Sequence, residues 1–219
     1  CSRTVPCKTW AGASPKRAAG GIINCIDPGG FGTVTITKSI TISCKHVEGS
    51  ALASSTTGIV INGASVNVVL RGLDIDGSPP TSPGLNGIRF LQGASLIVED
   101  CVIRRFNGAS PSGNGILVDN ASLTANIHVV NSNITGNGGA SSGAGIQISP
   151  TGTGRATVVI SNSNLVNNTI GIRASTAATT GGIGITVTDT TVAGSSTHGF
   201  VAEGTSGAVR MMLDRVVSA

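Results

Sequence analysis

Aromatic and charged side chains are scarce in this chain of 219 residues. Aromatic residues make up 2% of it and charged residues 11%, and tyrosine is absent. Sugar-binding platforms favour exposed aromatic rings, which argues against a carbohydrate-binding adhesive module. No run of Lys or Arg is longer than two residues, as at Arg104-Arg105, so the formal net charge of +4 predicts a mildly basic surface and no nucleic-acid partner.

Long apolar runs and familiar site motifs are missing too. No stretch approaches the roughly 20 apolar residues of a membrane-spanning helix, so no membrane span is predicted. No signal-peptide core precedes Cys1, and we expect a secreted or cell-surface bacterial protein, extracellular or periplasmic, whose signal peptide has been removed. Nucleotide-binding loops and a nucleophile elbow are absent, and His46, His128 and His198 lack zinc-ligand spacing. Neither a cofactor nor a metal is predicted.

Cysteine is present in an odd number. With five cysteines, at least one is free or pairs with another chain. Cys1 and Cys7 flank a short loop, and Cys25 and Cys44 lie in successive apolar segments, so both pairs are predicted disulfides. Cys101 lies where a strand meets a turn, and a buried thiol there behaves as a small hydrophobe. Two disulfides favour an oxidising compartment, in agreement with export.

Glycine is abundant and recurs with a fixed period. A Gly followed by an apolar residue is repeated every 26 to 30 residues, at Gly58, Gly87, Gly115, Gly145, Gly171 and Gly199. A second series has a similar period: Gly72, Asp100, Asn131, Asn162, Asp189 and Asp214. Repeats of this length, built from short alternating runs and polar turns, cannot bury their apolar face alone and must stack. The pattern predicts an all-β, right-handed parallel β-helix of about seven coils, forming one domain over residues 22–219.

Residues 1–21 differ from the repeat. They predict an N-terminal cap made of the Cys1–Cys7 loop and a short helix between Lys8 and Gly21. A cap is needed because an open solenoid end exposes unpaired strand edges. Residues 209–219 read as a strand that stops, so we expect the C-terminal end to be truncated, or uncapped and covered by another molecule.

Three segments carry a family resemblance: Cys1 to Trp10, the Ile-Asp-Pro-Gly-Gly-Phe-Gly segment at 26–32, and the alternating Thr/Ile run at 35–42. They resemble uncharacterised bacterial right-handed parallel β-helix repeat proteins of the pectate-lyase-like superfamily, and the resemblance covers the whole chain. The enzymes of that superfamily are mostly polysaccharide lyases and hydrolases. A fold alone does not imply a function, so the site must decide.

Polygalacturonases of this superfamily carry their catalytic acids on a strand reading Asn-Thr-Asp-Gly-x-Asp, which the Gly repeats resemble in position. The two later acids are replaced in successive coils by Asn86 and Arg89, Asn114 and Leu117, Ala144 and Gln147, and Ile170 and Arg173. Glycoside hydrolysis commonly needs two carboxyl groups. A hydrolase is therefore disfavoured.

A pectate lyase would use an Arg as base and Ca²⁺ held by clustered acids. Arg89 and Arg173 are candidate bases, but we expect no Asp or Glu at the outward positions between them, which disfavours a Ca²⁺ site. The densest charge cluster gives the remaining catalytic candidates: Asp74, Asp76, Asp100 and Arg104, together with Arg89. The repeat also places Arg71 beside Glu99 and Asp76 beside Arg104, and such stacked pairs stabilise a sheet by roughly 0.2 to 1 kcal/mol each without any catalysis.

Two columns of residues, three positions and one position before each member of the second series, are expected to face outward. One contains Val69, Ile97, His128, Val159, Thr186 and Met211, and the other contains Arg71, Glu99, Val130, Ser161, Thr188 and Leu213. Exposed apolar patches usually mark interfaces, so an interface is predicted at Val69, Ile97, His128, Val130, Val159, Met211 and Leu213. The alternative is that strands simply favour β-branched residues on both faces.

Three functions stay open at this stage. The first is a non-catalytic secreted or surface module with a structural or interaction role, self-associating laterally or end to end. The second is a lyase or hydrolase of an acidic polysaccharide, and only the lyase would require Ca²⁺. The third is a carbohydrate-binding adhesive module. The missing acids favour the first.

Overall fold

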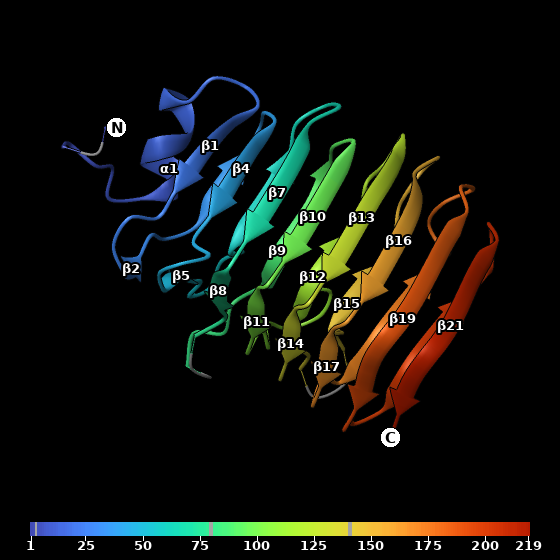
Figure 1. Cartoon of the computed structure of the whole chain (residues 1–219). Coiled ribbons are helices and arrows are strands. Elements are labelled where there is room, and N and C mark those ends of the chain that lie inside the picture. Colours follow the sequence, from blue (N-terminus) through green and yellow to red (C-terminus); the bar gives the residue numbers. More distant parts are fainter. Residues whose placement is uncertain (3, 79–80, 140–141) are drawn as a thin grey trace.

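Short runs of alternating apolar and polar residues form the strands, because successive side chains of a strand point to opposite faces. In the computed structural model these strands wind into a right-handed parallel β-helix, which confirms the predicted all-β solenoid. The structure describes residues 1–2, 4–78, 81–139 and 142–219. Successive coils stack side by side, and the two termini lie at opposite ends of the stack (Figure 1).

The coils build two parallel sheets. The first has 14 strands in two rows that join at β19, and β21 also pairs with β19. Its upper row comprises β1 (Gly21–Asn24), β4 (Ile40–Ser43), β7 (Asn67–Arg71), β10 (Ser95–Glu99), β13 (Thr124–Val130), β16 (Arg155–Ser161), β19 (Ile183–Ala193) and β21 (Val209–Ser218). Its lower row comprises β2 (Gly29–Gly30), β5 (Gly49–Leu52), β8 (Leu73–Asp76), β11 (Val102–Arg104), β14 (Asn133–Thr135) and β17 (Asn164–Val166).

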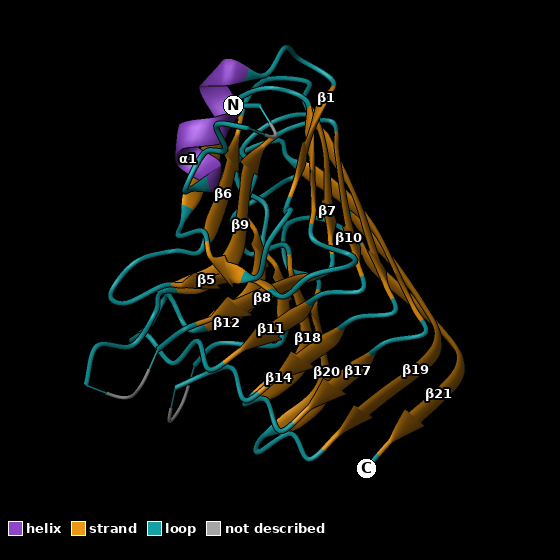
Figure 2. Ribbon diagram, turned by 60° about the vertical axis from the view of Figure 1, so that its left-hand side comes forward, coloured by secondary structure: helices purple, strands orange, loops and turns teal. Residues whose placement is uncertain are grey.

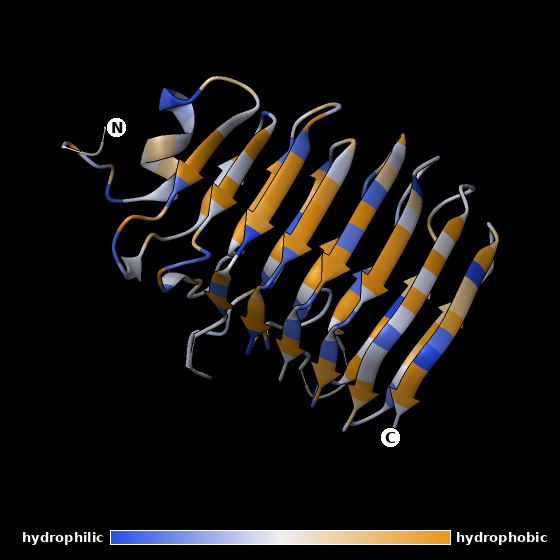
Figure 3. Ribbon diagram, in the orientation of Figure 1, coloured by the Kyte–Doolittle hydropathy of each residue, from blue (hydrophilic) through white to orange (hydrophobic). Residues whose placement is uncertain are grey.

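The second sheet has seven strands, close to the predicted number of coils. They are β3 (Val34–Ile36), β6 (Ile59–Asn62), β9 (Asn86–Gln92), β12 (Asn114–Val118), β15 (Ile146–Ile148), β18 (Ile170–Ser175) and β20 (His198–Glu203). Their inward residues stack from coil to coil, as in the column Ile36, Ile61, Phe90, Val118, Ile148 and Ala174. This column is fully buried and forms part of the core. Apolar segments recur along the coils for this reason (Figure 3).

The second sequence series marks the bend between the two rows of the first sheet. Gly72, Asp100, Asn131, Asn162 and Asp189 all have a left-handed backbone, with φ between 48° and 65°. Gly, Asn and Asp tolerate this conformation best, which explains their recurrence without catalysis. The series serves the bend.

Buried polar side chains form further ladders inside the coils. Asn137 accepts a hydrogen bond from the Phe106 backbone N–H, and the Asn137 backbone N–H donates to the side-chain oxygen of Asn168. The side chain of Asn114 donates to that of Asn86. Each amide thereby satisfies backbone groups of the adjacent coil that would otherwise be buried without a partner.

The predicted short helix is present at the N-terminal end of the stack (Figure 2). It comprises α1 (Trp10–Ala13) and a 3₁₀ turn, η1 (Ser14–Lys16). The indole of Trp10 is 1% exposed and stacks on Phe31, with ring centroids 5.7 Å apart. This contact fixes the helix against the first coil.

The last strand departs from the predicted register by one residue. Met211 pairs with Ile185 and Leu213 with Val187, so both point to the inward side, and their predicted outward placement is wrong. The left-handed position of this coil belongs to Arg215, not to Asp214. The observed register continues the apolar columns of β19, whereas the predicted one would have turned Arg210 inward. Met212, 61% exposed, takes the outward place beside Thr186.

Candidate functional site

The charge cluster predicted at Asp74, Asp76 and Arg104 exists on the outer face of β8 and β11. The strand register places Asp76 beside Arg104, as expected. Arg104 Nη2 lies 2.7 Å from Asp74 Oδ2, and Arg104 Nε lies 3.1 Å from Asp76 Oδ2. Arg105 binds Asp76 as well, with Nη2 at 2.5 Å from Oδ2. The two carboxylates are therefore held by two guanidinium groups from the next coil.

Asp74 and Asp76 differ in their electrostatics. Burial raises the pKa of Asp74 despite the nearby Arg104 charge, and its Oδ1 atom is buried without a hydrogen-bond partner among the described residues. Burial would raise the pKa of Asp76 too, but hydrogen bonds from Arg105 and from the Ser78 backbone N–H outweigh it and lower the pKa. Carboxyl pairs with opposite shifts occur in acid–base catalysis, although here an arginine occupies the space between them.

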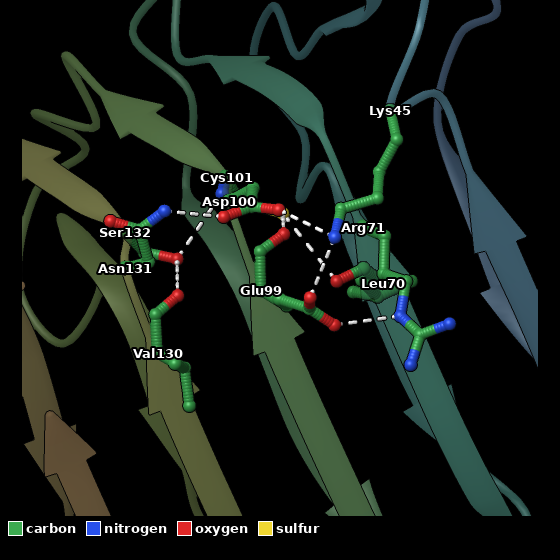
Figure 4. A network of polar contacts seen from close by, with 9 residues as sticks. All are labelled: Lys45, Leu70, Arg71, Glu99, Asp100, Cys101, Val130, Asn131 and Ser132. Carbon is green, nitrogen blue, oxygen red and sulfur yellow. Dashed lines mark hydrogen bonds and ion pairs between the residues drawn. The ribbon is translucent and has the colours of Figure 1, made fainter. Parts of the chain in front are cut away.

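Asp100 belongs to a separate network at the bend (Figure 4). Lys45 Nζ lies 2.8 Å from Glu99 Oε1 and 3.0 Å from Asp100 Oδ2, and Arg71 Nε lies 2.7 Å from Glu99 Oε2. The Asn131 side chain donates to Asp100 Oδ1. The hydrogen bonds from Asn131 and Lys45 lower the pKa of Asp100, and that from Lys45 lowers the pKa of Glu99.

Lys45 reaches these acids across an entire coil. It lies 54 residues from Glu99, and Gly72 occupies the intervening coil. A Cβ atom on Gly72 would lie 2.9 Å from the Lys45 backbone nitrogen. The glycine therefore permits both the left-handed bend and the close passage of Lys45.

Arg89 lies on the outer face of the second sheet, away from the other candidates. Its Nη2 lies 2.6 Å from Asp119 Oδ2, directly after β12. The prediction that no outward acid lies between Arg89 and Arg173 is therefore wrong. That prediction considered only the position two residues after each repeated glycine, which is Leu117 in this coil, and Asp119 lies two residues beyond it. Arg173 is paired as well, with Nη2 at 3.0 Å from Glu203 Oε2.

The structure thus brings together Asp74, Asp76 and Arg104, and it leaves Asp100 and Arg89 apart from them. Within the residues that the structure describes, eight of the chain's ten acidic residues form ion pairs with Arg or Lys: Asp74, Asp76, Glu99, Asp100, Asp119, Asp189, Glu203 and Asp214. In the part of the chain that the structure describes, no group of three or more His, Cys, Asp or Glu residues could hold a metal ion.

The partners Lys45, Asp119 and Glu203 were missed by the sequence analysis. Asp119 and Glu203 each follow their arginine by 30 residues, which is one coil, so the repeat itself contained the signal. Lys45 skips a coil and gave no such signal.

The predicted outward column is present over five strands, since Thr186 on β19 lies beside Val159, and it fails only at Met211. Val69, Ile97, His128 and Val159 are register neighbours on β7, β10, β13 and β16. The three aliphatic side chains are half-buried and the imidazole is exposed. Val130 lies in the adjacent column beside Glu99. An interface role for these residues stays a prediction.

Both predicted disulfides are present, joining Cys1 to Cys7 and Cys25 to Cys44. Cys101 is a buried free thiol. Its burial raises the pKa to about 12, so the thiolate is essentially absent at neutral pH. No described helix is long and apolar enough to cross a membrane.

Sequence comparison adds one decisive observation. The family model for the right-handed β-helix region matches residues 22–211, most of the chain. The chain belongs to this β-helix family. No curated protein matches the sequence.

A solved structure extends the comparison of the β-helix fold. The chain is similar to the crystal structure of pectate lyase Pel9A, with a TM-score of 0.62 and 16% identity. The similarity covers 92% of this chain and 62% of the Pel9A chain. At this identity the similarity shows a common fold alone, and the Pel9A activity is not transferred with it.

Proposed function

We propose that this β-helix is a non-catalytic structural or interaction module of a secreted or cell-surface protein. The observation that carries the proposal is the ion pairing of eight of its ten carboxylates. Most of these pairs join adjacent coils, where opposite charges stabilise the stacking of strands. The two disulfides support an oxidising, extracellular compartment.

Lateral self-association is the interaction that the surface supports. Val69, Ile97 and Val159 place aliphatic side chains on the outer face of the first sheet, where a globular chain would more often expose polar ones. The face is regular, because its residues follow the ladder of parallel strands. A second copy could pair with it without changing the coil.

The lyase alternative rests on the similarity to pectate lyase Pel9A. Its place in this chain would be the cluster of Asp74, Asp76 and Arg104. A lyase of this kind would require Ca²⁺ held by free carboxylates, but both acids here are already bound by guanidinium groups. The residues present therefore do not fit the ion.

An assay on acidic polysaccharides tests the proposal. The chain is incubated with polygalacturonate and with alginate, with and without Ca²⁺, and unsaturated products and new reducing ends are measured. Asp74→Asn/Asp76→Asn and Arg89→Ala variants are run in parallel. We expect no product from any of them. Product formation by the unmodified chain contradicts the proposal, and its loss in one of the variants would identify the site.

A further inference from the structure

A groove lies beside the N-terminal cap, between the Cys1–Cys7 loop, α1 and the first coil. Its volume is about 520 Å³, which is the size of pockets that enclose small organic ligands. Figure 1 shows the N-terminal segment, α1, β1 and β2 gathered at this end of the stack. Part of its wall comes from residues before Ile22, outside the region that the β-helix family model matches.

Apolar side chains line much of the groove. Ile23, Ile26, Pro28 and Phe31 contribute to its lining. Ile26 is 46% exposed and so offers apolar surface to a ligand. Phe31 is fixed in place because its ring stacks on the buried Trp10. Such a surface suits an apolar ligand body.

Cationic side chains also line this groove. Lys8 and Arg17 line it, and within the described residues neither takes part in an ion pair, in contrast to most arginines of the coils. Asp27 is the carboxylate of this lining. The lining thus carries two cationic side chains against one carboxylate, so the local charge is positive.

We propose that this groove binds a small organic anion with an apolar body, of the class of medium-chain aliphatic or aromatic carboxylates. The apolar part lies on Ile26, Pro28 and Phe31, and the carboxylate is bound by Lys8 and Arg17 through charge-assisted hydrogen bonds. The inference is independent of the proposed structural role, because the groove shares no residue with the charged clusters or the outward column.

Trp10 offers a direct readout. It is the chain's one tryptophan, and it stacks on a residue that lines the groove. Decanoate, below the concentration at which it forms micelles, is titrated into the full chain while Trp10 fluorescence is followed. We expect saturable binding of decanoate. Decanol and decyltrimethylammonium, which keep the chain length and remove or reverse the charge, should bind at least about tenfold more weakly.

Matched variants locate the site. Lys8→Ala/Arg17→Ala should weaken decanoate binding at least about tenfold. The control is Arg155→Ala/Arg210→Ala, which removes two cations from a smaller groove of about 370 Å³ elsewhere on the molecule and should leave binding unchanged. If the first variant fails to fold, Ile26→Glu replaces it, since this half-exposed position tolerates a charge and should abolish binding.

Three results with the small ligands would overturn the proposal. They are an absence of saturable binding, equal loss of binding in the two double variants, and equal affinity for decanoate and decyltrimethylammonium. Binding to vesicles of anionic phospholipid without any binding of free decanoate would also reject it, and would assign the cationic end to a lipid surface instead.

Discussion

Asp74 and Asp76 lie two residues apart on one strand, yet the protein shifts their pKa values in opposite directions. Asp74 has lost hydration that Arg104 does not fully replace, and one of its oxygens is buried without a partner among the described residues. Asp76 receives hydrogen bonds from Arg104, Arg105 and the Ser78 backbone. A single strand thus contains one carboxylate that costs stability when ionised and one that contributes it.

The two residues should therefore respond differently to replacement. A lowered folded-state pKa means that Asp76 stabilises the fold above its unfolded pKa, and that this contribution is lost as the pH falls through the folded value. We expect Asp76→Asn to reduce the free energy of unfolding by about 1 to 2 kcal/mol at pH 7 and by less at pH 3. For Asp74 the sign is reversed, so Asp74→Asn should be neutral or stabilising at pH 7. Urea unfolding at both pH values measures this, and equal losses for the two variants at pH 7 would contradict it.

Cys101 gives a second prediction at this scale. Its thiol is buried and its pKa is raised to about 12, so iodoacetamide should label no cysteine in the native chain at neutral pH. In denaturant without reductant one label is expected, and with reductant five, because two disulfides hold the other four cysteines. Intact mass spectrometry counts the labels. Five labels without reductant would show that neither disulfide forms.

At the scale of the element, the left-handed bend explains a column of residues that could have been mistaken for a catalytic row. Asn131 combines a φ of 48° with a side-chain hydrogen bond to Asp100. Asn131→Ala loses this hydrogen bond and places alanine in a left-handed backbone that alanine disfavours. We expect it to lower the free energy of unfolding by about 1 to 3 kcal/mol.

Asn131→Gly is the matched control for this substitution. It loses the same hydrogen bond but suits the left-handed backbone, so it should be markedly more stable than the alanine variant in the same urea experiment. If the two variants were equally stable, backbone conformation would not be the reason for the column.

The repeat predicted the coil because each unit carries its own bend residue and inward apolar residues. It failed where those signals became ambiguous. In β21 the run Val209 to Val217 contains apolar residues on both faces, so the register was placed one residue early at Met211 and Leu213. Lys45 was missed because its contact with Glu99 depends on the small size of Gly72, a property of three coils together. The groove at Lys8 and Arg17 arises from the cap and has no counterpart in the repeat.

At the scale of the whole molecule, the solenoid offers one long face bearing Val69, Ile97 and Val159. If the chain associates laterally through this face, Val159→Lys should weaken self-association at least tenfold, because an ammonium group would be desolvated at the contact. Thr157→Lys, an outward residue on the same strand, is the matched control and should have a smaller effect. Sedimentation equilibrium measures both. If the unmodified chain is monomeric at every concentration, the predicted interface is wrong.

The central claim is that the carboxylates of this β-helix are engaged in holding coils together. Titration of the Asp and Glu side-chain carboxyl groups by carbon-detected NMR tests it most directly. The claim predicts that Asp76, Glu99, Asp100, Asp189 and Glu203 titrate below their ordinary pKa values, because arginine, lysine or asparagine groups stabilise their charged forms, while Asp74 titrates above its ordinary value. Ordinary values for all six would mean that the ion pairs do not form in solution, and would leave these carboxylates free for chemistry.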